Sequence, residues 1–276
     1  MICFFHKSDY DGICSGALIK MLHKDCEMIG INYGEQFPWY SFKKDERVFM
    51  VDFSLQPFDQ MVKLNELCDL VWIDHHISAI NEAKKHNFDL EKHHVRDGIG
   101  ACQLVWEYLY PFMSVPLFVR LLALYDTWQF NDPRTLPFQY GLRVYNTNIG
   151  EQIWRELSNE SFVDKICETG HIILKYEKLQ NEKYAKACAF ETEIDGLKAI
   201  AINRALTSSM LFESVWDNTK YDCMLAFSFI GDRWVVSLYT DKEGVDVSIV
   251  AKNRGGGGHK QASGFPCDAL PFKTKL

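Results

Sequence analysis

The stretch LVWIDHH, residues 70–76, decides the fold of this chain. Its first four residues are apolar, as in a buried strand, and an acid and two imidazoles follow directly. Similar apolar runs occupy residues 1–5 and 48–51, and segments with helical periodicity separate the three runs. Short apolar strands that alternate with helices are typical of parallel βαβ units, so we predict an α/β fold with an N-terminal parallel sheet.

The rest of the chain divides into a helical part and a strand-rich part. Residues 99–110, 115–127 and 151–187 have helical periodicity, with Gly170 as a candidate break, whereas residues 199–203, 224–230 and 234–239 resemble strands. The pattern predicts an N-terminal domain over 1–150, a helical linker over 151–189 and a smaller α/β domain over 190–276.

Composition limits the classes of protein to which the chain can belong. A hydrophobic content of 47% with 24% charged residues excludes a disordered or collagen-like chain. The net charge of −7 argues against a surface that coats long DNA. No apolar run reaches the roughly 18–20 residues of a membrane span. The nine cysteines form no Cys-x-x-Cys pair, so we expect reduced thiols, a cytoplasmic protein and no membrane partner.

Acidic and imidazole side chains follow all three predicted N-terminal strands. They are His6, Asp9, Asp11, Asp52, Asp74, His75 and His76. Because ligand-binding residues of an open parallel sheet sit at the carboxyl ends of its strands, we expect these side chains to share one crevice. Gathered carboxylates repel one another unless a cation neutralises them. Carboxylate and imidazole ligands suit Mn²⁺, and also Zn²⁺, Fe²⁺ or Mg²⁺, and two such ions are the usual means of attacking phosphorus with water.

Simpler roles compete with metal binding at single positions. An aspartate after a strand, such as Asp11 or Asp52 taken alone, is often only a helix cap. Asp126 closes an apolar helical segment, where it could cap the helix, pair with Arg120 or Arg134, or bind a metal. Three acidic strand ends in succession favour metal binding over capping.

The stretch RGGGGHK, residues 254–260, is the second strong signal. Four glycines let backbone N–H groups approach an anion or a base closely, and Arg254, His259 and Lys260 add donors. The residues after the glycines could begin a helix and add its positive end. The motif is neither a Walker A loop nor a dinucleotide fingerprint, and a flexible linker is the alternative.

Together these motifs resemble those of the DHH phosphoesterases, named for a tripeptide that stands here as Asp74-His75-His76. The match extends from His6 to Asp126, and residues 255–260 resemble the hallmark of the DHH-associated C-terminal domain. The resemblance spans nearly the whole chain. It implies a DHH catalytic domain, a helical linker and a substrate-binding C-terminal domain, with the active site in the cleft between the domains.

The resemblance also implies a role for each motif residue. His6, Asp9 and Asp52 would hold one Mn²⁺, while Asp11, Asp52, His75 and Asp126 would hold the second. Asp74 would orient an imidazole, and His76 would contact the scissile phosphate. The substrate's far end would be bound by Arg254, Gly257, Gly258, His259 and Lys260.

Two departures from the family pattern affect these expectations. The first motif is His-x-x-Asp-x-Asp, one residue shorter than in many members, and this resembles the oligoribonuclease branch that degrades nanoRNA. Residues 97–102 read DGIGAC where a Ser/Thr-rich helix start is common, so any phosphate contact there would have to come from backbone N–H groups.

The resulting expectation is a Mn²⁺-dependent phosphodiesterase that cleaves short single-stranded oligonucleotides to mononucleotides. A cyclic or linear dinucleotide phosphodiesterase and a 3′-phosphoadenosine phosphatase are alternatives on the same scaffold. A nucleotide-binding sensor without turnover is the alternative from another class. The sequence leaves open whether the chain forms a homodimer.

Overall fold

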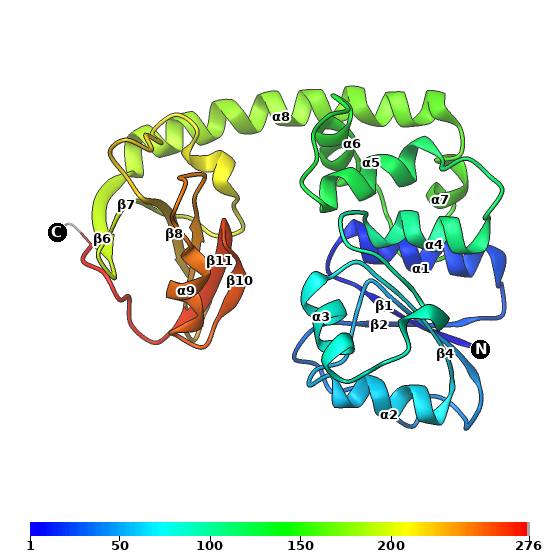
Figure 1. Ribbon diagram of the computed structural model, residues 1–276. Coiled ribbons are helices and arrows are strands. Elements are labelled where there is room, and N and C mark those ends of the chain that lie inside the picture. The colour runs from blue at the N-terminus through cyan, green and yellow to red at the C-terminus, as the bar shows by residue number, and fades with distance from the viewer. Residues whose placement is uncertain (275–276) are drawn as a thin grey trace. The chain divides into compact units, whose positions relative to one another are not determined.

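The computed structural model, which describes residues 1–274, has a five-stranded parallel sheet in its N-terminal part (Figure 1). Along the sheet the strand order is β2-β1-β3-β4-β5. The strands are β1 (Ile2–His6), β2 (Glu27–Ile31), β3 (Arg47–Val51), β4 (Asp69–Asp74) and β5 (His94–Val95). The predicted α/β fold with an N-terminal parallel sheet is confirmed.

The strand order places the carboxyl ends of β1 and β3 at a topological switch point. The chain passes from β1 to β2 on one side and then returns to form β3 on the other side of β1. The connections that leave β1 and β3 therefore diverge, and a crevice opens at the ends of these two strands. His6 ends β1 and Asp52 follows β3 directly, so both residues lie at this crevice.

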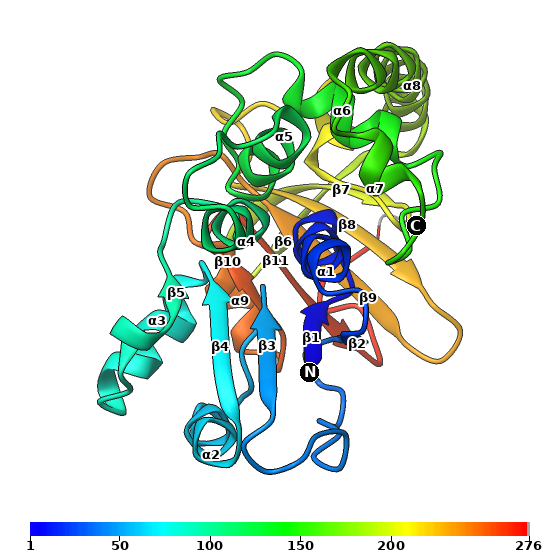
Figure 2. The same cartoon turned by 90° about the vertical axis from the view of Figure 1, so that its right-hand side faces the viewer.

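Helices cover both faces of the parallel sheet (Figure 2). Alternate strand residues supply the two cores: Phe5 and Val51 pack on one face, Phe4 and Met50 on the other. The first face is covered by α1 (Tyr10–Leu22), α4 (Ala101–Leu109) and α5 (Leu117–Asp126), and the second by α2 (Asp59–Leu67) and α3 (Ile77–Lys85). A short helix, η1 (Leu90–Lys92), precedes β5.

Strand β2 is absent from the sequence-based prediction. Its sequence, EMIGI, contains a charged residue and a glycine, and all of its residues but Ile31 are partly or fully exposed. An edge strand pairs with one neighbour only, so it does not need the continuous apolar run by which a central strand is recognised.

The helical region differs from its prediction at Gly170. Helices α6 (Thr135–Leu142) and α7 (Ile153–Glu156) precede α8 (Glu160–Cys188), which runs through Gly170 without a break. A Cβ at Gly170 would collide with the carbonyl oxygen of Pro137 in α6, and one at Gly141 with that of Ile166 in α8. These glycines therefore allow the two helices to pack closely, and the expected helix break at Gly170 is wrong.

The C-terminal part contains a mixed six-stranded sheet in the order β10-β11-β9-β8-β7-β6. Only the β7–β8 pair is parallel. One face packs on α9 (Val247–Lys252), and the other packs on η2 (Ser209–Phe212) and the end of α8. The strands are β6 (Phe190–Ile194), β7 (Leu197–Asn203), β8 (Cys223–Phe229), β9 (Trp234–Tyr239), β10 (Gly257–His259) and β11 (Ala262–Cys267).

The glycine-rich stretch forms a hairpin, which corrects the expectation of a helix after the glycines. Gly257 pairs with Gly264 and His259 with Ala262, so the residues after the motif turn back as strand β11. A Cβ at Gly256 would collide with the Gly264 carbonyl oxygen, and Gly258 has a φ of +129°. The requirements of the hairpin therefore account for part of the glycine run.

The chain separates into two compact units, Met1–Ile173 and Leu174–Leu276. The division falls within α8 and inside the stretch predicted as a linker over 151–189. The last two residues of the domain predicted over 190–276 lie outside the described residues. Among residues 1–274, none of the helices combines the length and the apolar character that crossing a membrane requires.

Replacing Gly170 with Ala should destabilise the N-terminal unit. The added methyl group meets backbone rather than a flexible side chain, so the helices must separate, and overpacking of this kind costs about 1–3 kcal/mol. Denaturant unfolding of G170A and of the control E168A, an exposed position on the same helix, would measure the difference. Equal stability of the two variants would contradict the close packing of α6 and α8.

Candidate metal centre

His6 and Asp9 are brought together where β1 passes into α1. Asp9 caps the helix, because its Oδ1 accepts a hydrogen bond from the Gly12 N–H at 2.9 Å. Its other oxygen, Oδ2, lies 2.8 Å from His6 Nδ1. The capping interaction therefore fixes Asp9 in an orientation that leaves one oxygen directed at the imidazole.

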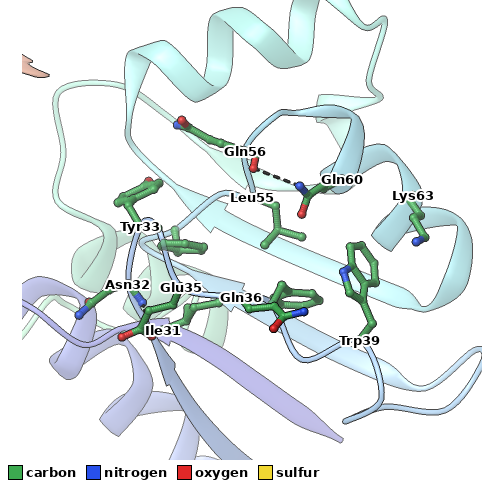
Figure 3. Close-up of a pocket in the computed structure, with 13 residues that line it drawn as sticks. Ile31, Asn32, Tyr33, Glu35, Gln36, Trp39, Leu55, Gln56, Gln60 and Lys63 are labelled. Carbon is green, nitrogen blue, oxygen red and sulfur yellow. Dashed lines mark hydrogen bonds between the residues drawn. The ribbon is translucent and has the colours of Figure 1, made fainter. Parts of the chain in front are cut away.

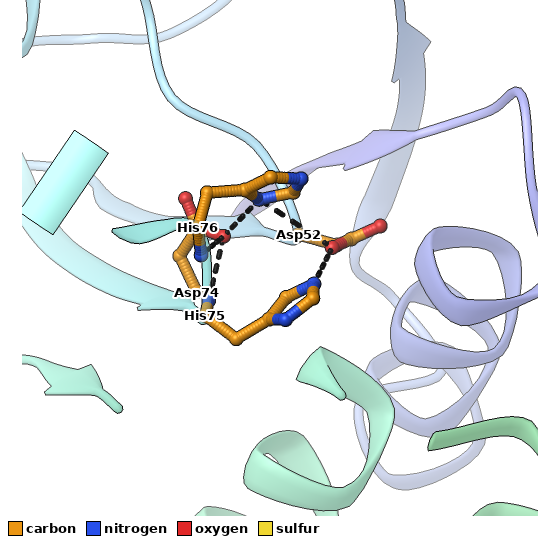
Figure 4. A group of neighbouring side chains, drawn as sticks. All are labelled: Asp52, Asp74, His75 and His76. Atoms are coloured by element: carbon orange, nitrogen blue, oxygen red, sulfur yellow. Dashed lines mark hydrogen bonds and ion pairs between the residues drawn. The ribbon is translucent and has the colours of Figure 1, made fainter. Parts of the chain in front are cut away.

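Asp52 lies between the imidazoles of His6 and His75. It is 2% exposed and has a φ of +55°, and its N–H donates to the Ile73 carbonyl at 2.9 Å. Its Oδ2 is 3.5 Å from His6 Nδ1, and its Oδ1 is 3.3 Å from His75 Nε2 (Figure 4 shows the His75 side). The two oxygens of one buried carboxylate thus face two separate groups of side chains.

His75 joins Asp52 to a second pair of carboxylates. Its Nε2 lies 3.0 Å from Asp126 Oδ2 and 3.7 Å from Asp11 Oδ2. Asp126 is the last residue of α5, and Asp11 lies in the first turn of α1. Residues more than a hundred positions apart in the chain therefore converge on one imidazole.

Asp11 is held by the first turn of α4. The N–H groups of Ala101 and Cys102 donate to its two oxygens at 2.6 and 2.8 Å. These are the free N–H groups of a helix start, where a negative charge is favoured. The sequence predicts a helix start in this segment, with a possible phosphate contact through its N–H groups, whereas in the structure two of these groups bind the Asp11 carboxylate.

Asp74 orients His76, as Figure 4 shows. Its Oδ1 lies 2.6 Å from His76 Nδ1 and accepts the His75 N–H at 2.7 Å, while its Oδ2 accepts the Trp72 indole N–H at 3.2 Å. Burial opposes the negative charge of Asp74, yet these interactions hold its pKa below the usual value. Nδ1 of His76 is therefore committed to Asp74, and the same contact raises the pKa of His76 to about 9 against the effect of burial.

The charges of the cluster shift one another's pKa values. Burial and the charges of Asp52 and Asp126 raise the pKa of Asp11 well above its ordinary value. Burial lowers the affinity of His6 and His75 for protons, but neighbouring carboxylates outweigh it and raise their pKa values to about 10 and about 11. Without a metal ion, protons on these imidazoles balance part of the carboxylate charge.

The donor atoms fit a pair of divalent cations. Ligand atoms of His6, Asp9 and Asp52 lie within 4.8 Å of one another, and so do those of Asp11, His75 and Asp126. His6 Nδ1, Asp52 Oδ1 and His75 Nε2 are buried and lack a well-aligned hydrogen bond, although charged partners are close. Buried nitrogen and oxygen atoms that lie close together without hydrogen-bonding one another are expected where all of them point at a bound ion. Asp52, Asp74, His75 and His76 form a further group of this kind.

The residues predicted to bind the substrate's far end lie in the C-terminal unit. Gly257, Gly258 and His259 form β10, and the side chains of His259 and Lys260 are exposed. The Arg254 guanidinium forms a two-point ion pair with Asp195, at 2.6 and 2.5 Å. This pair ties the start of the glycine stretch to the β6–β7 turn, so Arg254 has a structural partner in addition to the substrate contact predicted for it, which stays a prediction.

The aromatic surroundings of His6 were not recognised from the sequence. Tyr33 lies 5.7 Å and Phe53 6.1 Å from the His6 ring, measured between ring centroids. Tyr33 follows the unpredicted strand β2. The aromatic residues between positions 33 and 42 are the signal that could have drawn attention to this segment.

Comparison with curated proteins finds two relatives. An uncharacterized protein of Acanthamoeba polyphaga mimivirus, R106, is 27% identical over 83% of this chain, and the match spans only 56% of that protein. The oligoribonuclease NrnB of Bacillus subtilis is 25% identical over 96% of this chain and 72% of its own length. No family model matches the chain.

Solved structures share the fold. A pGpG-specific phosphodiesterase of Vibrio cholerae, PggH, superposes with a TM-score of 0.57 at 13% identity, covering 97% of this chain and 94% of that one. An exopolyphosphatase-related protein of Bacteroides fragilis gives a TM-score of 0.50 at 13% identity, covering 98% and 87%.

Metal binding should release protons. With pKa values of about 10 and about 11, His6 and His75 carry protons near pH 7.5, and an imidazolium cannot bind a metal. We expect release of at least about two protons per chain on saturation with Mn²⁺, from His6 and His75, and an affinity that rises with pH. Titration calorimetry in buffers of different ionisation enthalpy would count the protons.

His86 provides a control for that count. Its pKa is also raised, by hydrogen bonding to the Glu82 carbonyl and by Asp59, but it lies outside the cluster. H86A should release as many protons as the unmodified chain, and H75A about one fewer. Saturation without proton release would contradict binding through these imidazoles.

Proposed function

We propose that the chain is a DHH-family phosphoesterase, and that it is a divalent-metal-dependent phosphodiesterase that hydrolyses short oligonucleotides to mononucleotides. The observation that carries this proposal is the position of Asp52, with one carboxylate oxygen 3.5 Å from His6 Nδ1 and the other 3.3 Å from His75 Nε2. A bridging carboxylate between two imidazole-containing ligand groups is the arrangement that paired metal ions require.

The proposed ligands form two sets that share Asp52. His6 and Asp9 complete the first set, and Asp11, His75 and Asp126 complete the second. Four carboxylates balance two divalent cations in charge, and mixed oxygen and nitrogen donors without thiolates favour Mn²⁺ among the candidate metals. When bound, the ions would supply Lewis acidity that activates water and neutralises charge on the phosphate.

The protein's own contribution to the reaction is orientation and charge. Asp74 fixes the His76 ring through Nδ1, so Nε2 is the nitrogen left to meet the substrate. In its protonated form His76 would donate from Nε2 to a phosphate oxygen and stabilise the charge that develops as water attacks phosphorus. The hydrogen bonds from Ala101 and Cys102 to Asp11 hold that ligand in place before substrate arrives.

Short oligonucleotides are favoured as substrates by two observations. The relative NrnB, similar along nearly the whole chain, is named as an oligoribonuclease. The net charge of −7 suits a short substrate better than a long nucleic acid, whose many phosphates require many lysines and arginines. We further propose that Gly257, Gly258, His259 and Lys260 bind the end of the substrate away from the scissile phosphate.

A panel of phosphate compounds would test the proposed reaction. The purified chain with Mn²⁺ should convert a 5′-phosphorylated dinucleotide to mononucleotides faster than it hydrolyses a cyclic dinucleotide, 3′-phosphoadenosine phosphate or polyphosphate. Tight binding of the dinucleotide without products, with Mn²⁺, Mg²⁺ or Zn²⁺, would contradict the proposal and indicate a sensor.

Two variants should separate metal binding from substrate binding. D52N removes the shared ligand charge, so it should lose bound metal and at least about 100-fold in kcat/KM. H259A should keep its metal content and chiefly raise KM. Metal analysis and dinucleotide kinetics would compare both with D25N, an exposed aspartate outside the cluster. Full activity of D52N, or loss of metal from H259A, would contradict the assignment.

A further inference from the structure

A cavity of about 450 Å³ lies in the N-terminal unit beside the candidate metal centre (Figure 3). It opens between the segment that follows β2, residues 31–39, and the segment that follows β3, residues 53–63. No residue proposed above as a metal ligand lines it. The volume lies within the range of about 300–1,000 Å³ of ligand-binding pockets.

One aromatic side chain connects this cavity to the catalytic imidazoles. The Tyr33 ring, which lines the cavity, lies 5.7 Å from the His6 ring and 6.5 Å from the His76 ring. Phe53, a second lining residue, packs against Tyr33 at 4.4 Å. Tyr33 therefore borders both the cavity and the imidazole proposed to meet the scissile phosphate.

Two charged side chains line the cavity, and of these only the acid is in an ion pair. Glu35 pairs with Lys7 at 2.7 Å, whereas Lys63 lies 4.3 Å from the centre of the Trp39 ring and makes no ion pair among the described residues. A cation over an aromatic ring keeps its charge and its N–H donors. The occupant that suits these walls therefore carries no positive charge and offers hydrogen-bond acceptors, such as the carbonyl oxygens and ring nitrogens of a heterocycle.

The remaining walls are aromatic rings and carboxamides. Tyr33 and Trp39 are only partly buried, so their rings offer apolar surface to the cavity. Gln36 and Gln56 are exposed, and within the described part of the chain their carboxamides make no hydrogen bond. The Gln60 carboxamide, in contrast, donates from Nε2 to the backbone carbonyl oxygen of Gln56 at 3.1 Å. A carboxamide offers a donor and an acceptor side by side, which matches the edge of a nucleobase.

We propose that this cavity is a nucleobase subsite, which holds the base of the nucleotide next to the scissile phosphate. The inference rests on the proposed phosphodiesterase function and adds the means by which the N-terminal unit grips its substrate. Tyr33 would provide the stacking surface, Gln36 and Gln56 would bind the base edge, and Lys63, held over the Trp39 ring, would donate to an acceptor of the base. Stacking on aromatic rings tolerates any base, so the subsite would accept short oligonucleotides of varied sequence.

Replacing Gln36 or Tyr33 with alanine should weaken the binding of a substrate whose base enters the cavity on the order of 10–100-fold. Hydrolysis would be measured for Q36A and Y33A on a dinucleotide and on its two analogues that each lack one base. The substitutions should raise KM for the dinucleotide and for the analogue that keeps the base bound in the cavity. They should leave KM unchanged for the other analogue, because that analogue lacks the base that the cavity would bind. Tyr40, 91% exposed on the same segment and outside the cavity, supplies the matched control Y40A.

Equal losses on all three substrates, or no loss in Q36A, would overturn the subsite. Tyr33 lies next to the His6 and His76 rings, so Y33A could lower kcat by disturbing them. In that case Q36A alone decides whether the cavity binds a base.

A binding measurement separates failure of the subsite from failure of the proposed function. Calorimetry would compare a nucleoside 5′-monophosphate with ribose 5-phosphate, which lacks the base. The unmodified chain should prefer the nucleotide, and Q36A should lose on the order of 10-fold of that preference. If no phosphodiester is cleaved, the proposed function is wrong. The preference for the nucleotide over ribose 5-phosphate, and its loss in Q36A, would still show whether the cavity binds a base.

Discussion

The mutual repulsion of buried carboxylates is the constraint on which this site depends. Asp11 and Asp52 are each 2% exposed, and the start of α1, the end of β3 and the end of α5 bring Asp11, Asp52 and Asp126 within 3.7 Å of one atom, His75 Nε2. Burial and neighbouring charge together raise the pKa values of Asp11 and Asp52. The fold tolerates this arrangement because cations enter it, as protons on His6 and His75 or as metal ions in their place.

The strand order explains why these charges meet where they do. The switch point lies between β1 and β3, and His6, Asp52 and the residues Asp74–His76 stand at or directly after the ends of β1, β3 and β4. Structural hydrogen bonds then set the orientation of the ligands: the α1 cap for Asp9, the α4 start for Asp11 and the pairing with Asp74 for His76. Tyr33 borders both His6 and the cavity proposed for a base.

The sequence allowed the central strands and the acidic cluster to be predicted, because both are local signals. A buried strand needs a continuous apolar run, and the polar residues that follow it necessarily lie at its end. Strand β2, the role of Gly170 and the pairing of Arg254 with Asp195 depend instead on which distant segments pack together. The glycine motif is the clearest example of a structure that the local sequence does not determine. The same residues could begin a helix or form the observed hairpin, and the pairing with β11 selects the hairpin.

Two metal ions that share the Asp52 carboxylate would be magnetically coupled through it. Electron paramagnetic resonance of the Mn²⁺-saturated chain detects such coupling. We expect two Mn²⁺ per chain and the spectrum of a spin-coupled pair. A spectrum of isolated Mn²⁺ ions at full occupancy, or saturation at a single ion, would show that Asp52 does not bridge two ions.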